Sequence, residues 1–473
     1  MKRFRYLLLL IPGIYFSWIA AISTRLAGGE DGVMHHLFAR YVPDHQENLL
    51  DHWAKPLYVL LSAPFAQFGM YGSLLFNVLL AVLTMYFLWK TAENLGLESP
   101  WLAPAMLFSS TIYFYCIPSA VTEILFGFLL SAAFLASSRK NYSLAAALIS
   151  FLPFVRSEGN GIIFIFLLGL LFMKKWKAIP WLALGTLIYS IVGSFYFDDL
   201  FWVWNNNPYH DASDIYHNGT WYHYIEKTTA IWGIPLYLLW VIGSAFMLFH
   251  AIRLVVGKEK TSEKTWFWLF FVFGSFYVYL AGHSLVWALG KSASLGLIRV
   301  MAAVMPACAL IGMYAMDKIL YAINPNLEKV KLGMALILFF VLVKSPIELN
   351  HPPYAGDLEK EEIQKVGAWF RSSPYFPLKA PLYYFAPSMA EEFRIDPFDQ
   401  NRRKNLADYH SQDEMPQGTI VVWDGHFGPN ECHLPIDTLL NNTDLEVIHH
   451  QVPEKEMKAL NGYPYEIYLF RKK

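Results

Sequence analysis

The chain has 473 residues and a formal net charge of -1; 55% of its residues are apolar and only 16% are charged. Soluble domains carry roughly a quarter charged residues, so this depletion argues against a wholly soluble protein. A net charge near zero also excludes a large basic surface, and we expect no nucleic-acid partner. The three cysteines, Cys116, Cys308 and Cys432, offer neither a disulfide framework nor the spacing of a zinc site.

Long apolar runs fill residues 1–349, whereas residues 350–473 have the composition of a soluble domain. A bilayer span needs roughly 20 apolar residues. The runs predict about 11 transmembrane helices near residues 6–23, 72–90, 101–117, 120–137, 142–155, 159–173, 179–196, 231–252, 265–283, 297–316 and 332–347. The short pair 142–155 and 159–173 fits a partly re-entrant hairpin as well as two spans.

Lysine and arginine in the loops set the expected orientation. With the N-terminus in the cytoplasm, basic residues gather in runs on the inner side, such as 174–177, and occur singly on the outer side. We expect the first helix to be retained, because Tyr15, Phe16 and Trp18 stand where a signal peptide would need small residues. The odd helix count then places residues 350–473 outside the cytoplasm.

The C-terminal residues alternate helix and strand patterns. Residues 358–370 have helical spacing, and strands are predicted at 380–385, 419–423, 445–452 and 466–470. The sequence therefore predicts an α-helical polytopic membrane protein with a small α/β soluble C-terminal domain.

Two predicted outer loops are long. The first, residues 24–69, contains Gly28-Gly29-Glu30-Asp31-Gly32, and the glycine after the acids favours a tight turn that presents a carboxylate. Residues 56–61 of this loop form an amphipathic stretch expected along the membrane surface. The second loop, residues 197–230, is rich in tryptophan, tyrosine, asparagine and histidine, including Asn207, Tyr209 and His210.

Polar residues on the outer face suggest chemistry on a lipid-linked substrate. No dinucleotide fingerprint, P-loop or GxSxG motif occurs in the chain. Sugar transfer from a lipid phosphate needs a base for the acceptor hydroxyl and cationic or hydrogen-bonding groups for the departing phosphate. The outer face supplies both kinds of group, namely Glu30, Asp31, Arg156, His283, Lys291 and Arg299.

The basic N-terminus, the first helix and the following Gly-Glu-Asp-Gly motif resemble the polyprenyl-phosphate-dependent glycosyltransferases of the C superfamily. The segment 154–159 is similar to the Arg-Pro-Glu-Gly turn of the mannosyltransferase branch, and 297–306 resembles a late helix with an arginine before a proline. The resemblance implies transfer of a mannose-like hexose, with inversion, from a polyprenyl phosphate to a hydroxyl of a lipid, glycan or protein. It favours a bacterial inner membrane.

The resemblance also assigns residues. The acid of the first loop falls on Asp31 as general base, with Glu30 beside it, the arginine–glutamate pair on Arg156 and Glu158, and the late arginine on Arg299. The sequence departs from the family in Ser157, where proline is usual, and in the order Glu-Asp, which leaves both carboxylates as candidates for the base.

Other residues have weaker assignments. Lys55, Lys291 and His283 are further candidates for the carrier phosphate, and His35 or His36 for the phosphate or acceptor. Lys55 could instead be an interfacial anchor. The histidines and aspartates of the first loop match no common metal motif, so we expect neither a metal nor a cofactor.

Two structural interpretations stand beside these assignments. Arg156 and Glu158 could form an internal ion pair, because isolated charges are costly at membrane depth. Glu123 is interpreted as an acid at a helix start.

Two rival functions remain at this point. A flippase for a lipid-linked saccharide would be expected to carry ionisable residues near the membrane midplane and two related halves, which the sequence does not display. A non-catalytic assembly factor would bind a partner through the C-terminal domain.

Overall fold

The computed structural model describes residues 4–206, 208, 218–257, 261–291, 294–323, 327–410, 415–459 and 462–473. The chain forms two compact units. The membrane unit consists of Met1–Gly28 and Glu47–Tyr354, and the C-terminal unit of Gly29–Gln46 and Ala355–Lys473. Residues 29–46, predicted to belong to an outer loop of the membrane module, are thus grouped with the C-terminal residues.

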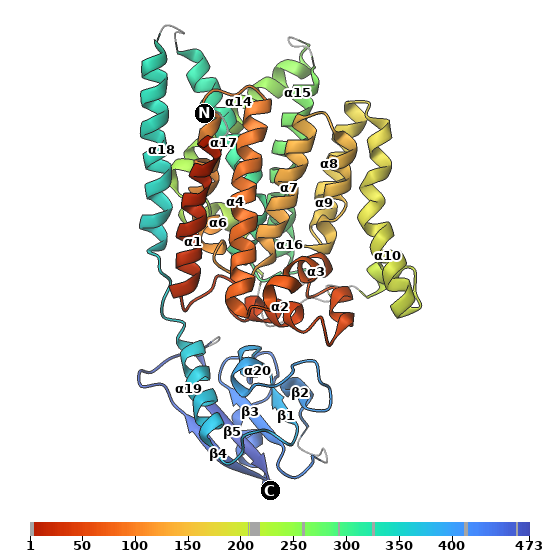
Figure 1. The fold of residues 1–473 in the computed structure, drawn as a ribbon, viewed down its shortest axis with the longest axis vertical. Coiled ribbons are helices and arrows are strands. Elements are labelled where there is room, and N and C mark those ends of the chain that lie inside the picture. The colour runs from red at the N-terminus through yellow and green to blue at the C-terminus, as the bar shows by residue number, and fades with distance from the viewer. Residues whose placement is uncertain are drawn as a thin grey trace. The chain divides into compact units, whose positions relative to one another are not determined.

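The membrane unit is helical (Figure 1). Its α-helices are α1 (Leu10–Ile22), α3 (Pro56–Ala66), α4 (Met70–Asn94), α5 (Ala103–Phe108), α6 (Thr111–Cys116), α7 (Thr122–Ser138), α8 (Tyr142–Ile149), α9 (Gly159–Phe172), α10 (Leu184–Phe197), α11 (Trp202–Asn205), α12 (His223–Glu226), α13 (Thr228–Ile231), α14 (Ile234–Val255), α15 (Glu263–Trp266), α16 (Ser275–Leu289), α17 (Met305–Ala322) and α18 (Glu328–Asn350). Helices of other types are η1 (Phe4–Leu9), η3 (Pro100–Leu102), η4 (Leu152–Phe154), η5 (Trp176–Ala183), η6 (Phe267–Gly274) and η7 (Ile298–Val304).

Within the described residues, six helices are long and apolar enough to cross a membrane, and the protein is therefore treated as an integral membrane protein. They are Met70–Asn94, Trp176–Phe197, Ile234–Val255, Glu263–Leu289, Ile298–Ala322 and Glu328–Asn350. Shorter apolar helices lie at Tyr6–Ile22, Pro56–Ala66, Thr122–Ser138, Tyr142–Phe154 and Gly159–Phe172. The total of about 11 spans stays a prediction.

The helix expected at 101–117 is divided in two. Its halves, α5 and α6, meet at Ser109 and Ser110, and the Ser110 side chain caps α6 by accepting a hydrogen bond from the Tyr113 amide. A serine at this position satisfies an amide that the start of a helix otherwise leaves unpaired. The cap therefore favours two short helices over one.

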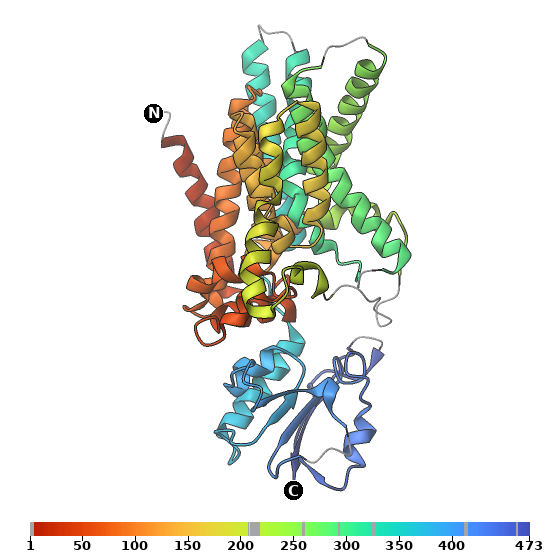
Figure 2. The same ribbon diagram turned by 90° about the vertical axis from the view of Figure 1, so that its right-hand side faces the viewer.

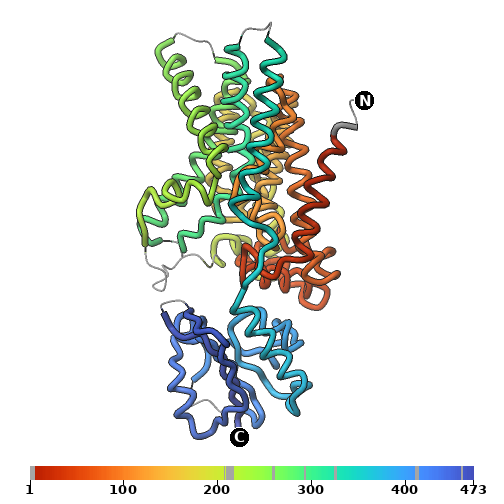
Figure 3. Tube along the Cα trace, turned by 90° about the vertical axis from the view of Figure 1, so that its left-hand side faces the viewer, coloured from red at the N-terminus to blue at the C-terminus, as the bar shows by residue number. Residues whose placement is uncertain are grey.

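The helices differ sharply in burial. In the span ending with α17, 89% of the apolar window is buried, whereas in α18 only 17% is buried. Helix α18 runs along the side of the bundle (Figure 3). At the α14–α17 contact, a Cβ on Gly243 would lie 2.6 Å from the Ile311 carbonyl oxygen, so glycine is needed for this close approach. Helix α17 thus forms the centre, and α18 offers its apolar surface to lipid.

The C-terminal unit contains a five-stranded sheet in the order β2-β1-β3-β5-β4. The strands are β1 (Leu382–Tyr384), β2 (Arg403–Asn405), β3 (Ile420–Asp424), β4 (Leu445–Gln451) and β5 (Ile467–Lys472), and the helices are α2 (Glu30–Arg40), α19 (Leu358–Ser372), α20 (Ser388–Phe393) and α21 (Ile436–Leu440). Helices lie on both faces of the sheet (Figure 2). All five residues of β3 are buried, as expected for a strand covered on both sides.

Four of the five strands and α19 confirm the predicted elements. The polar strand β2 was not predicted. The tight turn predicted at Gly32 is wrong, because Gly32 lies inside α2. The unusual backbone conformation is that of Gly29, the residue before α2. Its φ angle is 49°, a value that favours glycine.

Candidate functional site

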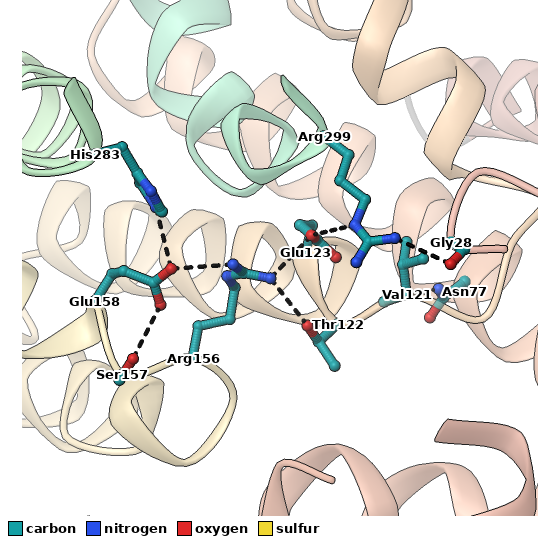
Figure 4. A network of polar contacts seen from close by, with 10 residues as sticks. All are labelled: Gly28, Asn77, Val121, Thr122, Glu123, Arg156, Ser157, Glu158, His283 and Arg299. Atoms are coloured by element: carbon teal, nitrogen blue, oxygen red, sulfur yellow. Dashed lines mark hydrogen bonds and ion pairs between the residues drawn. The ribbon is translucent and has the colours of Figure 1, made fainter. Parts of the chain in front are cut away.

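A row of charged and polar side chains joins four elements of the membrane unit (Figure 4). Figure 4 shows the row passing from His283 through Glu158, Arg156, Glu123 and Arg299 to the Gly28 carbonyl. We call this set the charge network. It brings together four residues predicted for a site, namely Arg156, Glu158, His283 and Arg299.

Arg156 is the centre of the charge network. Its Nη1 lies 2.8 Å from Glu123 Oε1, and its Nη2 lies 3.0 Å from Glu158 Oε1. Nη1 also lies 3.4 Å from the Thr122 hydroxyl. Charge-assisted bonds to two carboxylates compensate the cost of burying an arginine. The predicted Arg156–Glu158 ion pair is confirmed, and it is one part of a larger arrangement.

Arg299 forms the end of the charge network that contacts Gly28, the residue before the Gly29-Glu30-Asp31-Gly32 segment, here called the acid motif. Its Nε lies 3.5 Å from Glu123 Oε1, and its Nη1 donates a hydrogen bond of 3.0 Å to the Gly28 carbonyl oxygen. Gly28 and Asp31 are three residues apart, so the chain itself keeps their Cα atoms within about 11 Å of each other. Arg299 therefore holds the point from which the acid motif starts.

His283 forms the opposite end. Its Nε2 lies 3.1 Å from Glu158 Oε1, and its ring packs against two tyrosines. The ring centroids are 4.6 Å from Tyr279 and 6.0 Å from Tyr224. Helix α16 supplies His283 and Tyr279, while the second outer loop supplies Tyr224. The imidazole is thus held beside Glu158 by ring packing on both sides.

Local sequence explains how these side chains are placed. A Cβ on Gly159 would lie 2.5 Å from the Leu152 carbonyl carbon, so only glycine allows α9 to start directly against η4. That tight junction carries Arg156 and Glu158. On the other side, the Asn77 side chain donates to the Val121 carbonyl at 2.8 Å and fixes the entry to α7. Glu123 follows in the first turn of that helix.

Lys55 lies at the start of α3 and has an unusual backbone. Its φ is 67°, a conformation that costs a non-glycine residue about 1–3 kcal/mol and often marks a functional position. Burial lowers the pKa of Lys55 to about 8, and Glu158 is the strongest charge acting in the other direction. Lys55 is therefore electrostatically coupled to the charge network.

The two acids of the motif lie in the C-terminal unit, in the first turn of α2. The Glu30 carboxylate accepts hydrogen bonds from the Ser388 amide at 2.7 Å and the Ser388 hydroxyl at 2.5 Å. Burial raises the pKa of Glu30 to about 7, although both bonds oppose the shift. Asp31 is half-buried.

The remaining predicted residues have different surroundings. His35 and His36 are buried in α2, and His36 Nε2 lies 3.6 Å from Glu391 Oε1. Burial, together with Arg40, lowers the pKa of His36 to about 4, so it is neutral at pH 7. Lys291 is exposed in the turn after α16. In the second outer loop, Trp202 and Tyr224 are buried and Trp204 is exposed, whereas Asn207, Tyr209 and His210 lie outside the described residues.

Glu123 is the residue that sequence reasoning undervalued. It does lie in the first turn of α7, as predicted, but its side chain is only 2% exposed and contacts both arginines. The available signal was its position in an otherwise apolar stretch, because a buried carboxylate requires a cation. Thr122, Asn77 and Tyr279 carried no comparable signal.

The fold and this site define a polytopic membrane protein with a buried charge network and a small α/β unit. The same fold occurs in the crystal structure of ArnT from Cupriavidus metallidurans bound to undecaprenyl phosphate, with a TM-score of 0.61, 9% identity, and coverage of 98% of this chain and 97% of that chain. The electron cryo-microscopy structure of the arabinofuranosyltransferase AftD from mycobacteria has a TM-score of 0.50 and 11% identity, over 98% of this chain and 40% of that one. No family model and no curated protein sequence matches the chain.

Proposed function

We propose that the protein is a glycosyltransferase that moves a sugar from a polyprenyl-phosphate carrier to a hydroxyl acceptor on the outer face of the membrane. The fold shared with ArnT, whose structure contains undecaprenyl phosphate, supports the carrier, and that shared with AftD supports glycosyl transfer. The charge network carries the proposal, because it gathers two arginines, Arg156 and Arg299, among apolar helices, where the departing carrier phosphate would need cations.

The proposed reaction has one displacement step. The acceptor oxygen attacks the anomeric carbon of the sugar, and its proton passes to the Asp31 carboxylate. The bond between that carbon and the phosphate oxygen breaks, and the carrier leaves as polyprenyl phosphate. A single displacement inverts the anomeric configuration. Because the leaving group is already an acidic phosphate, the step needs cations and hydrogen-bond donors more than a general acid.

The charge network supports the phosphate half of this proposal. Its two arginines are balanced by Glu123 and Glu158. Lys55 and His283 add nitrogen groups that can bind an added phosphate, and Arg156 and Arg299 contribute further hydrogen-bond donors. We assign Arg299, Arg156, Lys55 and His283 to the carrier phosphate in this sense, with Glu158 orienting Arg156 and His283. Lys291, His35 and His36 remain weaker candidates for the phosphate or acceptor.

The sugar we propose is a mannose-like hexose. Its ring and hydroxyls would contact the aromatic and asparagine side chains of the second outer loop, and the C-terminal unit would help to cover the acceptor. The proposed setting is a bacterial inner membrane, with a cytoplasmic N-terminus and an extracytoplasmic C-terminal unit. The acceptor is a lipid, glycan or protein hydroxyl.

Purified full-length protein with a panel of radiolabelled polyprenyl-phosphate sugars, and crude membranes as acceptor, tests this function. The expected result is transfer from one donor, with the opposite anomeric configuration in the product. Folded protein that transfers no sugar from any donor, while moving a fluorescent lipid-linked saccharide across vesicles, would replace the enzyme with a flippase.

A further inference from the structure

The sheet of the C-terminal unit contains a topological switch point. Strand β1 pairs in parallel with β2 on one side and with β3 on the other. The connection from β1 leads to β2, whereas the connection from β3 leads to β4 on the opposite side, so the strand order reverses between β1 and β3. In open α/β sheets of this kind, ligands bind in the crevice outside the carboxyl ends of the strands at the switch point. In this unit the segments 385–388 and 424–428 lie at the carboxyl ends of β1 and β3.

A carboxylate of this protein is bound just beyond the carboxyl end of β1. Ser388 begins α20, four residues after the end of β1, and is buried. Its amide and hydroxyl both donate to the Glu30 carboxylate, at 2.7 and 2.5 Å. The Glu30 carboxylate is therefore held by the first residue of α20.

We propose that Glu30 is a positioning residue whose carboxylate, bound at this switch point, fixes the first turn of α2 and with it the direction of Asp31. The part concerning Asp31 rests on the proposed function. The side chains of successive residues in an α-helix point about 100° apart. When Glu30 is held in place, the direction of the Asp31 side chain is therefore fixed as well. Both Glu30 oxygens accept hydrogen bonds, which suits an anchor better than a proton acceptor.

Contacts at the other end of α2 explain why one more anchor is needed at its start. The Phe38 ring lies 4.8 Å from Phe398, and His45 Nε2 lies 2.8 Å from Asp396 Oδ2. These contacts hold the end of α2 and the turn that follows it. The first turn begins after Gly29, whose positive φ gives the chain freedom to change direction. The Glu30–Ser388 pair fixes the first turn of the helix, directly beside Asp31.

A double-mutant cycle on the full-length protein tests the anchor without any assay of function. Glu30→Gln, Ser388→Ala and the double variant are compared by hydrogen–deuterium exchange of the amides in residues 29–40. Because a hydrogen bond to a charged group is lost, each single change should accelerate exchange about 10-fold, and the double variant should add little. Glu361→Gln and Ser372→Ala, at exposed positions of α19, are the matched controls. Additive effects, or wild-type exchange in Ser388→Ala, would overturn the proposal.

Kinetics test the consequence for Asp31. Ser388→Ala should lower kcat about 10-fold with an unchanged KM for the donor, and Ser388→Thr, which keeps both donors, should restore kcat. Loss of donor affinity without a change in kcat would overturn the positioning role. If the wild-type protein transfers no sugar but the exchange cycle is non-additive, the anchor stands and the proposed function fails.

Discussion

The two units hold their carboxylates in opposite ways. In the membrane unit, Glu123 and Glu158 each meet an arginine, and charge is compensated by charge. In the C-terminal unit, Glu30 meets the neutral donors of Ser388, and its pKa is raised to about 7. The difference teaches that similar side chains serve different purposes: the first group builds a permanent polar site within apolar helices, and the second anchors a helix through neutral hydrogen-bond donors.

The largest effect is expected from Asp31, which the comparison leaves as the candidate for proton transfer. Asp31→Asn removes the accepting carboxylate and should lower kcat about 10²–10⁴-fold, measured by transfer from a labelled donor. Asp437→Asn, at an exposed position of α21, is the control and should keep wild-type activity. Full activity of Asp31→Asn would assign the base to another group.

The arginine-based arrangement predicts a large loss of stability when its centre is removed. Arg156→Ala leaves Glu123 and Glu158 without their closest cation and should destabilise the membrane unit by about 3–5 kcal/mol in thermal unfolding in detergent. Lys344→Ala breaks an exposed pair with Glu348, one turn further along α18, and should cost less than about 1 kcal/mol. Equal losses in both variants would remove the distinction between the two kinds of carboxylate.

The neutral-donor arrangement predicts a pH dependence in the C-terminal unit. Because the folded pKa of Glu30, about 7, exceeds its ordinary value of 4.5, the folded state holds the proton more tightly. Stability from this group is complete below pH 4.5 and is lost as pH rises to 7, by at most about 3 kcal/mol. Urea unfolding of Glu30→Gln should show a smaller decline over this range than the wild-type protein. An identical decline would assign the effect to Asp424, whose pKa burial raises to about 6.

Lys55 extends the comparison from the carboxylates to a cationic side chain. Burial lowers its pKa to about 8, so it loses its charge above that pH, and the KM for the phosphate donor should rise about 10-fold between pH 7 and 9. Lys55→Arg should remove this rise, because arginine stays protonated. Lys55→Met should have a high KM at every pH. A pH-independent KM in the wild-type protein would exclude Lys55 from donor binding.

The sequence predicted those elements whose pattern is local. Long apolar runs placed most helices of the membrane unit, and alternation placed β1, β3, β4 and β5. Strand β2 was not predicted, because Arg403–Asn405 is short and polar and lacks alternating apolar residues. Helix α2 was not predicted, because three glycines near its first residues are typical of a loop. The helix is stabilised by contacts such as that of Glu30 with Ser388, which are 358 residues apart.

The candidate site was predictable only in part, for a related reason. Arg156, Glu158, His283 and Arg299 were identifiable as ionisable residues in apolar surroundings. Their common partner Glu123 was not, because its role depends on which helix starts meet in space. The sequence could indicate that buried charges need partners, but the pairing of Arg299 with both Glu123 and the Gly28 carbonyl requires the fold.

The discontinuity of the C-terminal unit has a consequence for synthesis. Gly29–Gln46 leaves the ribosome well before Ala355–Lys473, with roughly 300 residues of membrane unit between them. Because the ribosome adds about 5–20 residues per second, the sheet that packs against α2 is completed roughly 15–60 s after α2 itself. During this interval the Gly-Glu-Asp-Gly motif has been synthesised, but the sheet that packs against it has not. A chain shortened at its C-terminus would therefore lose the structure around residues 29–46 as well.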